Sequence, residues 1–163
     1  MAKRTASTGT PATLLLQQAG VPHTLHKYVH DPAATDFGLE AARELGLPPE
    51  RIFKTLMVAV DGNLAVAVVP VSGNLNLKSF AASLGAKKSV LADPLAAQRR
   101  TGYVLGGISP LGQRRPSPTV LDSSAVDYPT ILVSGGRRGL DIELAAQDLI
   151  RLTGARLAAI GTG

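Results

Sequence analysis

The chain contains no cysteine and very few aromatic residues. The lack of cysteine excludes disulfides, thiolate metal sites and every mechanism in which the protein itself supplies a thiol nucleophile. Aromatic residues make up only 4% of the 163 residues, and tryptophan is absent. The core must therefore be built from Ala, Val, Leu and Ile, and this length is typical of one domain that buries most of its apolar surface.

Long apolar runs are also missing, since none approaches the roughly 20 residues that a bilayer-spanning helix needs. The N-terminal MAKRTASTGTP has a basic pair but no apolar segment behind it, which is unlike a secretory signal. We therefore expect a cytoplasmic protein without a membrane partner. Residues 1–9 are expected to be a disordered tail and residues 10–163 a single domain, and the sequence leaves the oligomeric state open.

Histidine offers little for acid–base or metal chemistry, because only His23, His26 and His30 are present. His26 and His30 would face the same side of a strand but lie roughly 13 Å apart, which is too far to share a metal ion. No HExxH motif, carboxylate cluster or GxSxG elbow occurs. We predict no metal site, no cofactor and no triad of the α/β-hydrolase type.

The net charge of +5 is concentrated in residues 78–138, which hold nine basic residues against three acidic ones. Four basic doublets lie beside predicted turns: Lys87-Lys88, Arg99-Arg100, Arg114-Arg115 and Arg137-Arg138. Loops that converge with such charge are typical of polyphosphate binding. An ordinary basic surface predicts the same pattern, and no aromatic-rich strand is available to stack bases, so both interpretations stay open.

Capping residues, prolines and glycines divide the chain into alternating elements. The expected helices cover residues 11–18, 39–45, 77–84, 94–100 and 145–152. The expected strands cover residues 22–29, 52–60, 64–69, 87–91, 119–122, 130–134 and 140–144. Hairpins mixed with scattered helices predict an α+β domain with a curved, barrel-like mixed β-sheet and helices packed around it.

The strand RIFKTLMVAV (residues 51–60) contains an unusual lysine. Because side chains alternate along a strand, Lys54 shares a face with Ile52, Leu56 and Val58. A lysine near the start of a strand can extend its amine to water. It can equally point into a polar pocket that binds an anion or a carbonyl group, and the strand alone does not decide between the two.

Two glycine-rich stretches are candidates for ligand binding. Residues 101–112 contain four glycines and are followed by Arg114-Arg115, and residues 134–139 contain Arg137-Arg138. Glycine lets a ligand approach the backbone, so that N–H groups can line an anion or carbonyl site. Each stretch alone is more often a structural turn, but two of them in one domain favour a binding cleft.

Four motifs together resemble the YbaK family of aminoacyl-tRNA deacylases. They are HKYVHDP (residues 26–32), IFKTL (52–56), TGYVLGGISPLGQRR (101–115) and VSGGRRGLDIEL (133–144). The resemblance runs from about Pro11 to Ile160 and is closest to bacterial Cys-tRNA(Pro) deacylases, which are relatives of the editing domain of prolyl-tRNA synthetase. It implies a hydrolase that removes cysteine from mischarged Cys-tRNA(Pro), with Cys-tRNA(Cys) as a second candidate substrate and prolyl-tRNA synthetase as the expected partner.

The resemblance also implies the site residues. The essential lysine of the family falls on Lys54, and the substrate pocket is expected to include Tyr28, Phe37, Thr55, Gly106, Gly107, Ser109 and Asp141. The arginines expected to contact tRNA are Arg114, Arg115, Arg137 and Arg138.

In the chemistry suggested for the family, the substrate's own thiol attacks its ester while the enzyme positions the reacting atoms. This implied mechanism leaves two roles open for Lys54, as an anchor for the terminal adenosine or its phosphate, or as an oxyanion stabiliser. Two alternative functions remain, a deacylase for another substrate such as Ala-tRNA(Pro) and a non-catalytic module that binds tRNA or a synthetase.

Overall fold

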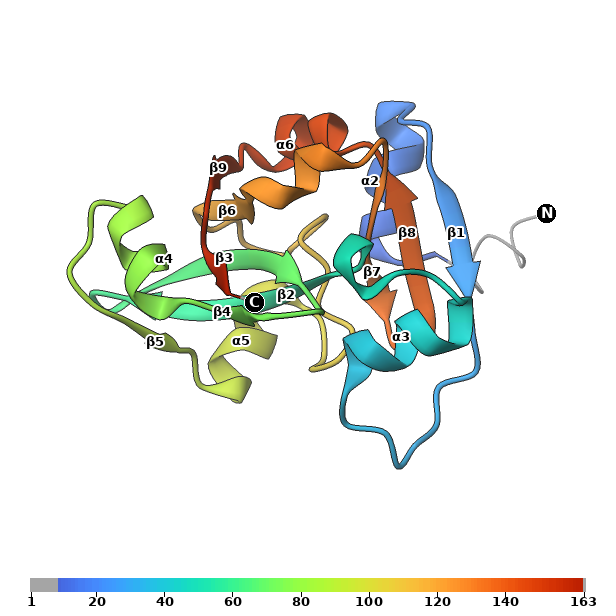
Figure 1. Cartoon of the computed structure of the whole chain (residues 1–163), viewed down its shortest axis with the longest axis horizontal. Coiled ribbons are helices and arrows are strands. Elements are labelled where there is room, and N and C mark those ends of the chain that lie inside the picture. Colours follow the sequence, from blue (N-terminus) through green and yellow to red (C-terminus); the bar gives the residue numbers. More distant parts are fainter. Residues whose placement is uncertain (1–8, 163) are drawn as a thin grey trace.

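The computed structural model describes residues 9–162, and its strands form three sheets (Figure 1). The five-stranded sheet has the order β5-β2-β3-β6-β9, the three-stranded sheet β1-β8-β7, and β10 pairs with β4. The helices are α2 (Pro11–Ala19), α3 (Phe37–Leu45), α4 (Leu77–Ser83), α5 (Pro94–Thr101) and α6 (Ala146–Thr153), with 3₁₀ turns η1 (Pro49–Arg51) and η2 (Ser123–Asp127). The strands are β1 (Thr24–Lys27), β2 (Phe53–Val60), β3 (Asn63–Pro70), β4 (Asn74–Leu75), β5 (Ser89–Leu91), β6 (Thr119–Asp122), β7 (Ile131–Arg137), β8 (Leu140–Leu144), β9 (Arg156–Ala158) and β10 (Gly161–Thr162).

The helices begin at the predicted capping residues. Thr10, Asn76 and Asp93 each accept a hydrogen bond from the backbone N–H three residues further on, which satisfies a donor that the first helical turn leaves free. Gly20 ends α2 in a left-handed conformation with φ of 67°, which glycine adopts without strain. These local signals confirm the predicted positions of α2, α4 and α5.

The hairpin of β2 and β3 has apolar side chains on both of its faces. Phe53 and Met57 face one core, whereas Val58 and Val60 face a second core that Phe80 of α4 completes. Two-sided burial explains why these strands read as nearly continuous apolar runs. Lys54 belongs to the face that Val58 and Val60 occupy. It lies near the start of β2, where the side chains of this face are only partly buried.

The three-stranded sheet meets the five-stranded sheet just before β2. Ile52 pairs with Leu132 of β7 in an isolated parallel bridge, and both side chains lie in a third apolar cluster with Ala41 of α3 and Val71. Figure 1 shows α3 lying across the region where the two sheets approach each other.

The mixed α+β architecture is confirmed, but the barrel-like closure of the sheet is not. Within residues 9–162 the five-stranded sheet stays open, with β5 and β9 as its edge strands. Both edge strands have only three residues, so they cannot pair along the whole sheet and close it. No helix in this part of the chain has the length and apolar character to cross a bilayer.

Several predicted boundaries were also wrong. The glycine-rich stretch 134–139 is mostly strand, because β7 continues to Arg137 with a register shift after Ser134. A side chain at Gly135 would lie 2.6 Å from Leu140 Cγ, so this glycine allows close hairpin packing. The predicted strand at 22–29 shortens to β1, and the short strands β4, β9 and β10 were missed. Apart from Gly9, the predicted N-terminal tail lies outside the described residues.

The C-terminal segment is attached to the sheet through one carboxylate. Asp122 accepts hydrogen bonds from the N–H groups of Ile160 and Gly161 and from the hydroxyl of Ser124. Burial alone would raise the pKa of Asp122, but these hydrogen bonds outweigh it and lower the pKa below its usual value.

We expect Asp122→Ala to lower the free energy of unfolding by about 2–3 kcal/mol, because it leaves the buried N–H of Ile160 and the partly buried N–H of Gly161 without their acceptor. Since the pKa of Asp122 is lowered, its contribution is present above the unfolded-state value and is lost as the pH falls through the folded-state value. Urea unfolding of both proteins at pH 7 and pH 3 measures this. An equal difference between the two proteins at both pH values would contradict the assignment.

Candidate active site

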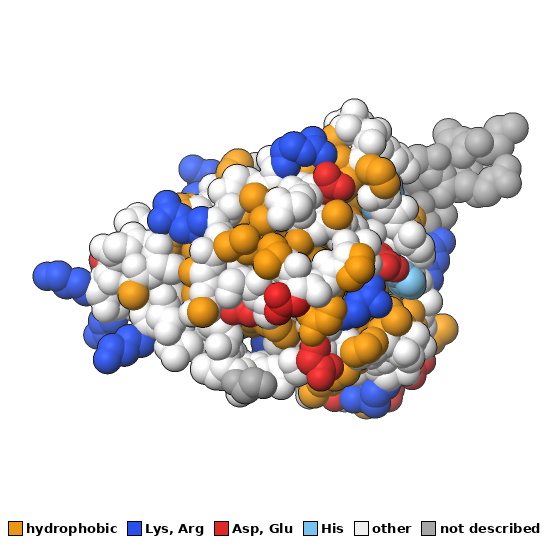
Figure 2. All heavy atoms as spheres, turned by 45° about the horizontal axis from the view of Figure 1, so that its top comes forward, with side chains coloured by type: hydrophobic (Ala, Val, Ile, Leu, Met, Phe, Trp, Pro, Cys, Tyr) orange, Lys and Arg blue, Asp and Glu red, His pale blue; other side chains and the backbone are white. Residues whose placement is uncertain are grey.

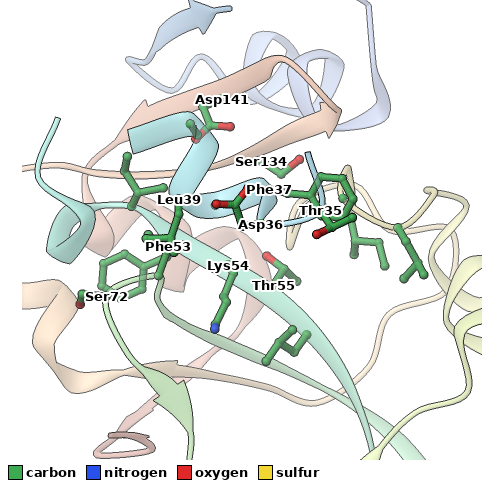
Figure 3. A pocket seen from close by; sticks show the side chains of 18 of the residues that line it. Thr35, Asp36, Phe37, Leu39, Phe53, Lys54, Thr55, Ser72, Ser134 and Asp141 are labelled. Atoms are coloured by element: carbon green, nitrogen blue, oxygen red, sulfur yellow. The ribbon is translucent and has the colours of Figure 1, made fainter. Parts of the chain in front are cut away.

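A cavity of about 600 Å³ lies between α3 and the ends of the two sheets (Figure 3). Its walls come from the start of α3, the first residues of β2, the turn at 71–74, the glycine-rich loop at 105–108 and the strand pair β7–β8. A volume of this size is typical of sites for small molecules or for one end of a larger ligand. The turn at 71–74 and α3 touch closely, since a side chain at Gly38 would lie 2.2 Å from Val71 Cγ1.

Lys54 lines the cavity from β2 and does not simply extend into solvent. Its Nζ donates a hydrogen bond of 3.0 Å to the carbonyl oxygen of Gly73, which holds the turn at 71–74. Partial burial lowers the pKa of the Lys54 ammonium. Among the described residues this ammonium has no ion-pair partner, and Figure 3 shows it directed away from Asp141.

Asp141 occupies the other end of the cavity, on the central strand of the three-stranded sheet. It lies between His26 and Ser134 in the strand register and is only 6% exposed. Burial raises the pKa of this carboxyl to about 7, and no hydrogen bond within residues 9–162 compensates for the lost water. A buried carboxyl without a partner is suited to a cationic ligand group.

Two hydroxyl groups, those of Tyr28 and Thr55, also line the cavity. Burial, together with the nearby Asp141, raises the pKa of Tyr28 to about 12, so the phenol stays protonated. Thr55 Oγ1 is buried and has no hydrogen-bond partner in the described part of the chain. Because buried hydroxyls are normally bonded, the Thr55 hydroxyl is available to a ligand in the cavity.

An aromatic wall closes the side of the cavity nearest the glycine-rich loop. The Arg138 guanidinium lies 4.7 Å from the centre of the Phe37 ring, and its Nε donates to the Leu105 carbonyl oxygen at 2.9 Å. Gly106 has φ of +83°, and a side chain there would lie 2.9 Å from the Phe37 ring. Only glycine therefore fits this position, for both conformational and steric reasons.

Sequence and structure comparisons agree on one family. The model of the aminoacyl-tRNA editing domain matches residues 31–152. The chain belongs to the aminoacyl-tRNA editing domain family. It is 35% identical to a protein of Enterococcus faecalis named "Putative Cys-tRNA(Pro)/Cys-tRNA(Cys) deacylase EbsC", with 99% of each chain covered.

Two further relatives link the fold to prolyl-tRNA synthetase. A solved structure described as "a putative trans-editing enzyme for prolyl tRNA synthetase" matches with a TM-score of 0.83 and 25% identity, over 96% of this chain and 98% of that one. The proline–tRNA ligase of Moorella thermoacetica is 35% identical over 68 residues, which are 42% of this chain and 12% of the ligase. The aligned part of the ligase is therefore a small fraction of that enzyme.

The structure brings together most of the residues that the sequence predicts for the site of this editing domain. The residues that line the cavity are Tyr28, Phe37, Lys54, Thr55, Gly106 and Asp141. Gly107 and Ser109 lie outside its lining. The Gly107 N–H already donates to Val104, and Ser109 is fully buried with its hydroxyl bonded to the Leu111 N–H. The roles of all these residues in binding stay predictions.

The basic doublets of the editing domain do not all gather at the cavity. Arg100 and Arg115 are neighbours, since the Arg115 N–H donates to the Arg100 carbonyl oxygen, and both lie at the C-terminal end of α5. Arg114 and Arg115 are exposed, whereas Arg138 packs on Phe37 at the cavity. On the face in Figure 2, basic side chains stand in separate groups with hydrophobic side chains exposed between them.

Sequence reasoning missed two parts of the site, Ser134 and the turn around Gly73. Ser134 lies directly opposite Asp141 in the β7–β8 pair and lines the cavity. The β7–β8 register would have identified Ser134, because it pairs Ser134 with Asp141. Because a loop was predicted at 134–139, no register was assigned there. For the turn, the sequence VSGN at 71–74 was the available signal. Residues 9–162 contain no cluster of three or more potential metal-ligating side chains.

We expect Asp141→Asn to stabilise the folded protein at pH 8. The pKa of Asp141 is about 7 when folded, above its ordinary value of 3.8, so its contribution to stability is present at low pH and is lost as the pH rises to about 7. An amide removes this penalty, and we expect a gain of at least about 1 kcal/mol at pH 8. Urea unfolding at pH 5 and pH 8 measures the gain, which should shrink at pH 5; a loss of stability at pH 8 would overturn the assignment.

Proposed function

We propose that this editing domain hydrolyses the ester bond of Cys-tRNA(Pro) and releases cysteine and intact tRNA. The full-length similarity to the protein named as a Cys-tRNA(Pro)/Cys-tRNA(Cys) deacylase supports this substrate. The similarity to a trans-editing enzyme for prolyl-tRNA synthetase supports a role beside that synthetase, in the cytoplasm where tRNA is charged. Such correction is needed because cysteine and proline are similar in size, and a pocket discriminates weakly between similar side chains.

The observation that carries the proposal is the opposite placement of Asp141 and Lys54 along one cavity. An aminoacyl ester has an α-ammonium at one end and a ribose with phosphates at the other. The Asp141 carboxylate is suited to the ammonium, and the Lys54 ammonium is suited to the terminal nucleotide or to the developing oxyanion. In the proposed complex, the ester carbonyl lies between the two charges, and the Thr55 hydroxyl, which has no partner within residues 9–162, is available to it.

Ammonium binding changes the state of the Asp141 carboxyl. Without a ligand, a carboxyl whose pKa is about 7 is half protonated near neutral pH. An adjacent cation favours the charged form and lowers this pKa. Substrate binding therefore releases a proton from Asp141 and places its charge next to the ammonium.

Among residues 9–162, those that line the cavity include no histidine and no thiol. In the proposed reaction, the substrate's own sulfur attacks its ester carbonyl carbon, and a four-membered thiolactone forms as the carbon–oxygen bond to tRNA breaks. The thiol loses its proton in this step, and the freed tRNA oxygen takes up a proton in its place, so the tRNA leaves with its hydroxyl restored. Water then opens the strained thiolactone to give cysteine. The enzyme contributes orientation and charge stabilisation to this sequence.

We expect Lys54→Ala to lower kcat/KM for Cys-tRNA(Pro) by at least about 100-fold, because it removes a charge from the reacting end of the cavity. Lys54→Met should lose as much, since it keeps the length of the side chain without the ammonium. Lys27→Ala is the matched control, because Lys27 is exposed at the end of β1 and does not line the cavity, and it should keep the rate of the wild type. Cysteine release close to that of the wild type by both Lys54 variants would reject the assignment.

The nucleophile can be identified with a substrate that differs by one atom. If the thiol attacks, Ser-tRNA(Pro) should react at least about tenfold more slowly than Cys-tRNA(Pro), because a hydroxyl ionises far less readily than a thiol. Deacylation of Cys-, Ser- and Ala-charged tRNA(Pro), with and without the synthetase, measures this. Equal rates for Cys-tRNA(Pro) and Ser-tRNA(Pro) would indicate that an activated water is the nucleophile. Faster hydrolysis of Ala-tRNA(Pro) would indicate a different editing substrate. Binding of charged tRNA without hydrolysis would indicate a non-catalytic module.

A further inference from the structure

Arg138 connects three segments that are distant in the sequence at the edge of the cavity. Its guanidinium stacks on Phe37 at the start of α3, and its Nε donates to the Leu105 carbonyl in the glycine-rich loop. Arg138 itself belongs to the turn between β7 and β8. The backbone of Gly106 fills the remaining space, since a side chain there would lie 2.7 Å from Arg138 Nε.

Phe37 has a second contact, with His30 in the loop before α3. The His30 ring lies 5.8 Å from the Phe37 ring, tilted by 42°. Glu40, which is only 3% exposed, fixes His30, since its Oε1 lies 2.7 Å from His30 Nδ1. Its other oxygen accepts from the Asp31 N–H. Phe37 is thus positioned by His30 and by Arg138.

We propose that Arg138 is a positioning residue that holds Phe37 and the Leu105–Gly106 loop together and so sets the width of the amino-acid end of the cavity. This inference rests on the proposed function and deepens it. It differs from the sequence-based expectation that Arg138 contacts tRNA. Within the protein, one face of the Arg138 guanidinium already packs on Phe37, and its Nε–H already donates to the Leu105 carbonyl. Both Phe37 and Leu105 line the cavity.

The expected consequence is a role in amino-acid discrimination. Phe37, Leu105 and Gly106 form the wall that a bulkier substrate side chain would have to displace. Pockets reject an extra methylene only weakly unless their walls are rigid. Without the Arg138 contacts, the Phe37 ring and the loop can move apart and admit larger side chains.

Binding of two non-hydrolysable analogues tests this inference separately from catalysis. We use 3′-amino-3′-deoxyadenosine coupled through an amide to cysteine or to leucine, neither of which carries a tRNA body. For Arg138→Gln, the ratio of Kd for the leucyl to the cysteinyl analogue should fall about three- to tenfold, from the loss of one exposed cation–π contact and one hydrogen bond. Arg138→Lys, which keeps a cation near the ring, should give an intermediate ratio.

Arg151→Gln is the matched control, because Arg151 is exposed and pairs with Asp148 within α6. It should leave the ratio unchanged. If Arg138→Gln also leaves the ratio unchanged but weakens binding of whole tRNA, Arg138 is a tRNA contact and the inference is overturned. An equal fall in the control overturns it as well.

A spectroscopic measurement makes the result independent of the proposed function. One Hα of Gly106 points toward the Phe37 ring, since a side chain built in that direction would lie 2.9 Å from the ring, so its NMR chemical shift reports the ring position. Arg138→Gln should move this resonance in the ligand-free protein, while Arg151→Gln should not. A shifted resonance together with an inactive wild type would reject the deacylase proposal alone, whereas an unmoved resonance would reject the role of Arg138.

Discussion

The site depends on one constraint, the burial of strand β2 on both of its faces. Phe53 and Met57 fix one face against the larger core, and Val58 and Val60 fix the other against α4. Any shift in register would move apolar side chains out of both cores at once. The strand therefore holds Lys54 and Thr55 rigidly on its opposite faces. Both residues lie near the start of β2, where the strand borders the cavity.

The electrostatic design of the cavity works against the stability of the fold. Asp141 lies on a central strand, nearly inaccessible to water, and its charged form has no partner within the described chain. Such an arrangement is unfavourable until a cation binds. Glu143 lies two residues further along the same strand. It accepts hydrogen bonds from Thr130 and Arg51. Two carboxylates two residues apart thus differ in their surroundings: Glu143 is hydrogen-bonded within the protein, whereas Asp141 has no such partner among the described residues and is proposed to bind the ligand's ammonium.

The sequence predicts local structure better than it predicts the shape of the site. Caps at Thr10, Asn76 and Asp93 are local signals, so the helix starts could be located. The alternation around Lys54 identified an unusual ammonium but gave no partner. Its bond to Gly73 and the opposition of Ser134 and Asp141 depend on register and on contacts between distant segments. The contact between Arg138 and the Phe37 ring was missed for the same reason, because an exposed arginine doublet in the sequence does not reveal a stacked ring.

The tight contact at Gly38 determines where this cavity can change. With no room between α3 and Val71, and with Lys54 holding the adjoining turn, that end of the cavity behaves as a fixed block. The wall beside the glycine-rich loop is closed only by an exposed arginine, a ring and a loop. Altered amino-acid preference, in natural relatives or in redesigned editing domains, should therefore arise from substitutions in the loop and the β7–β8 turn, with the lysine end unchanged.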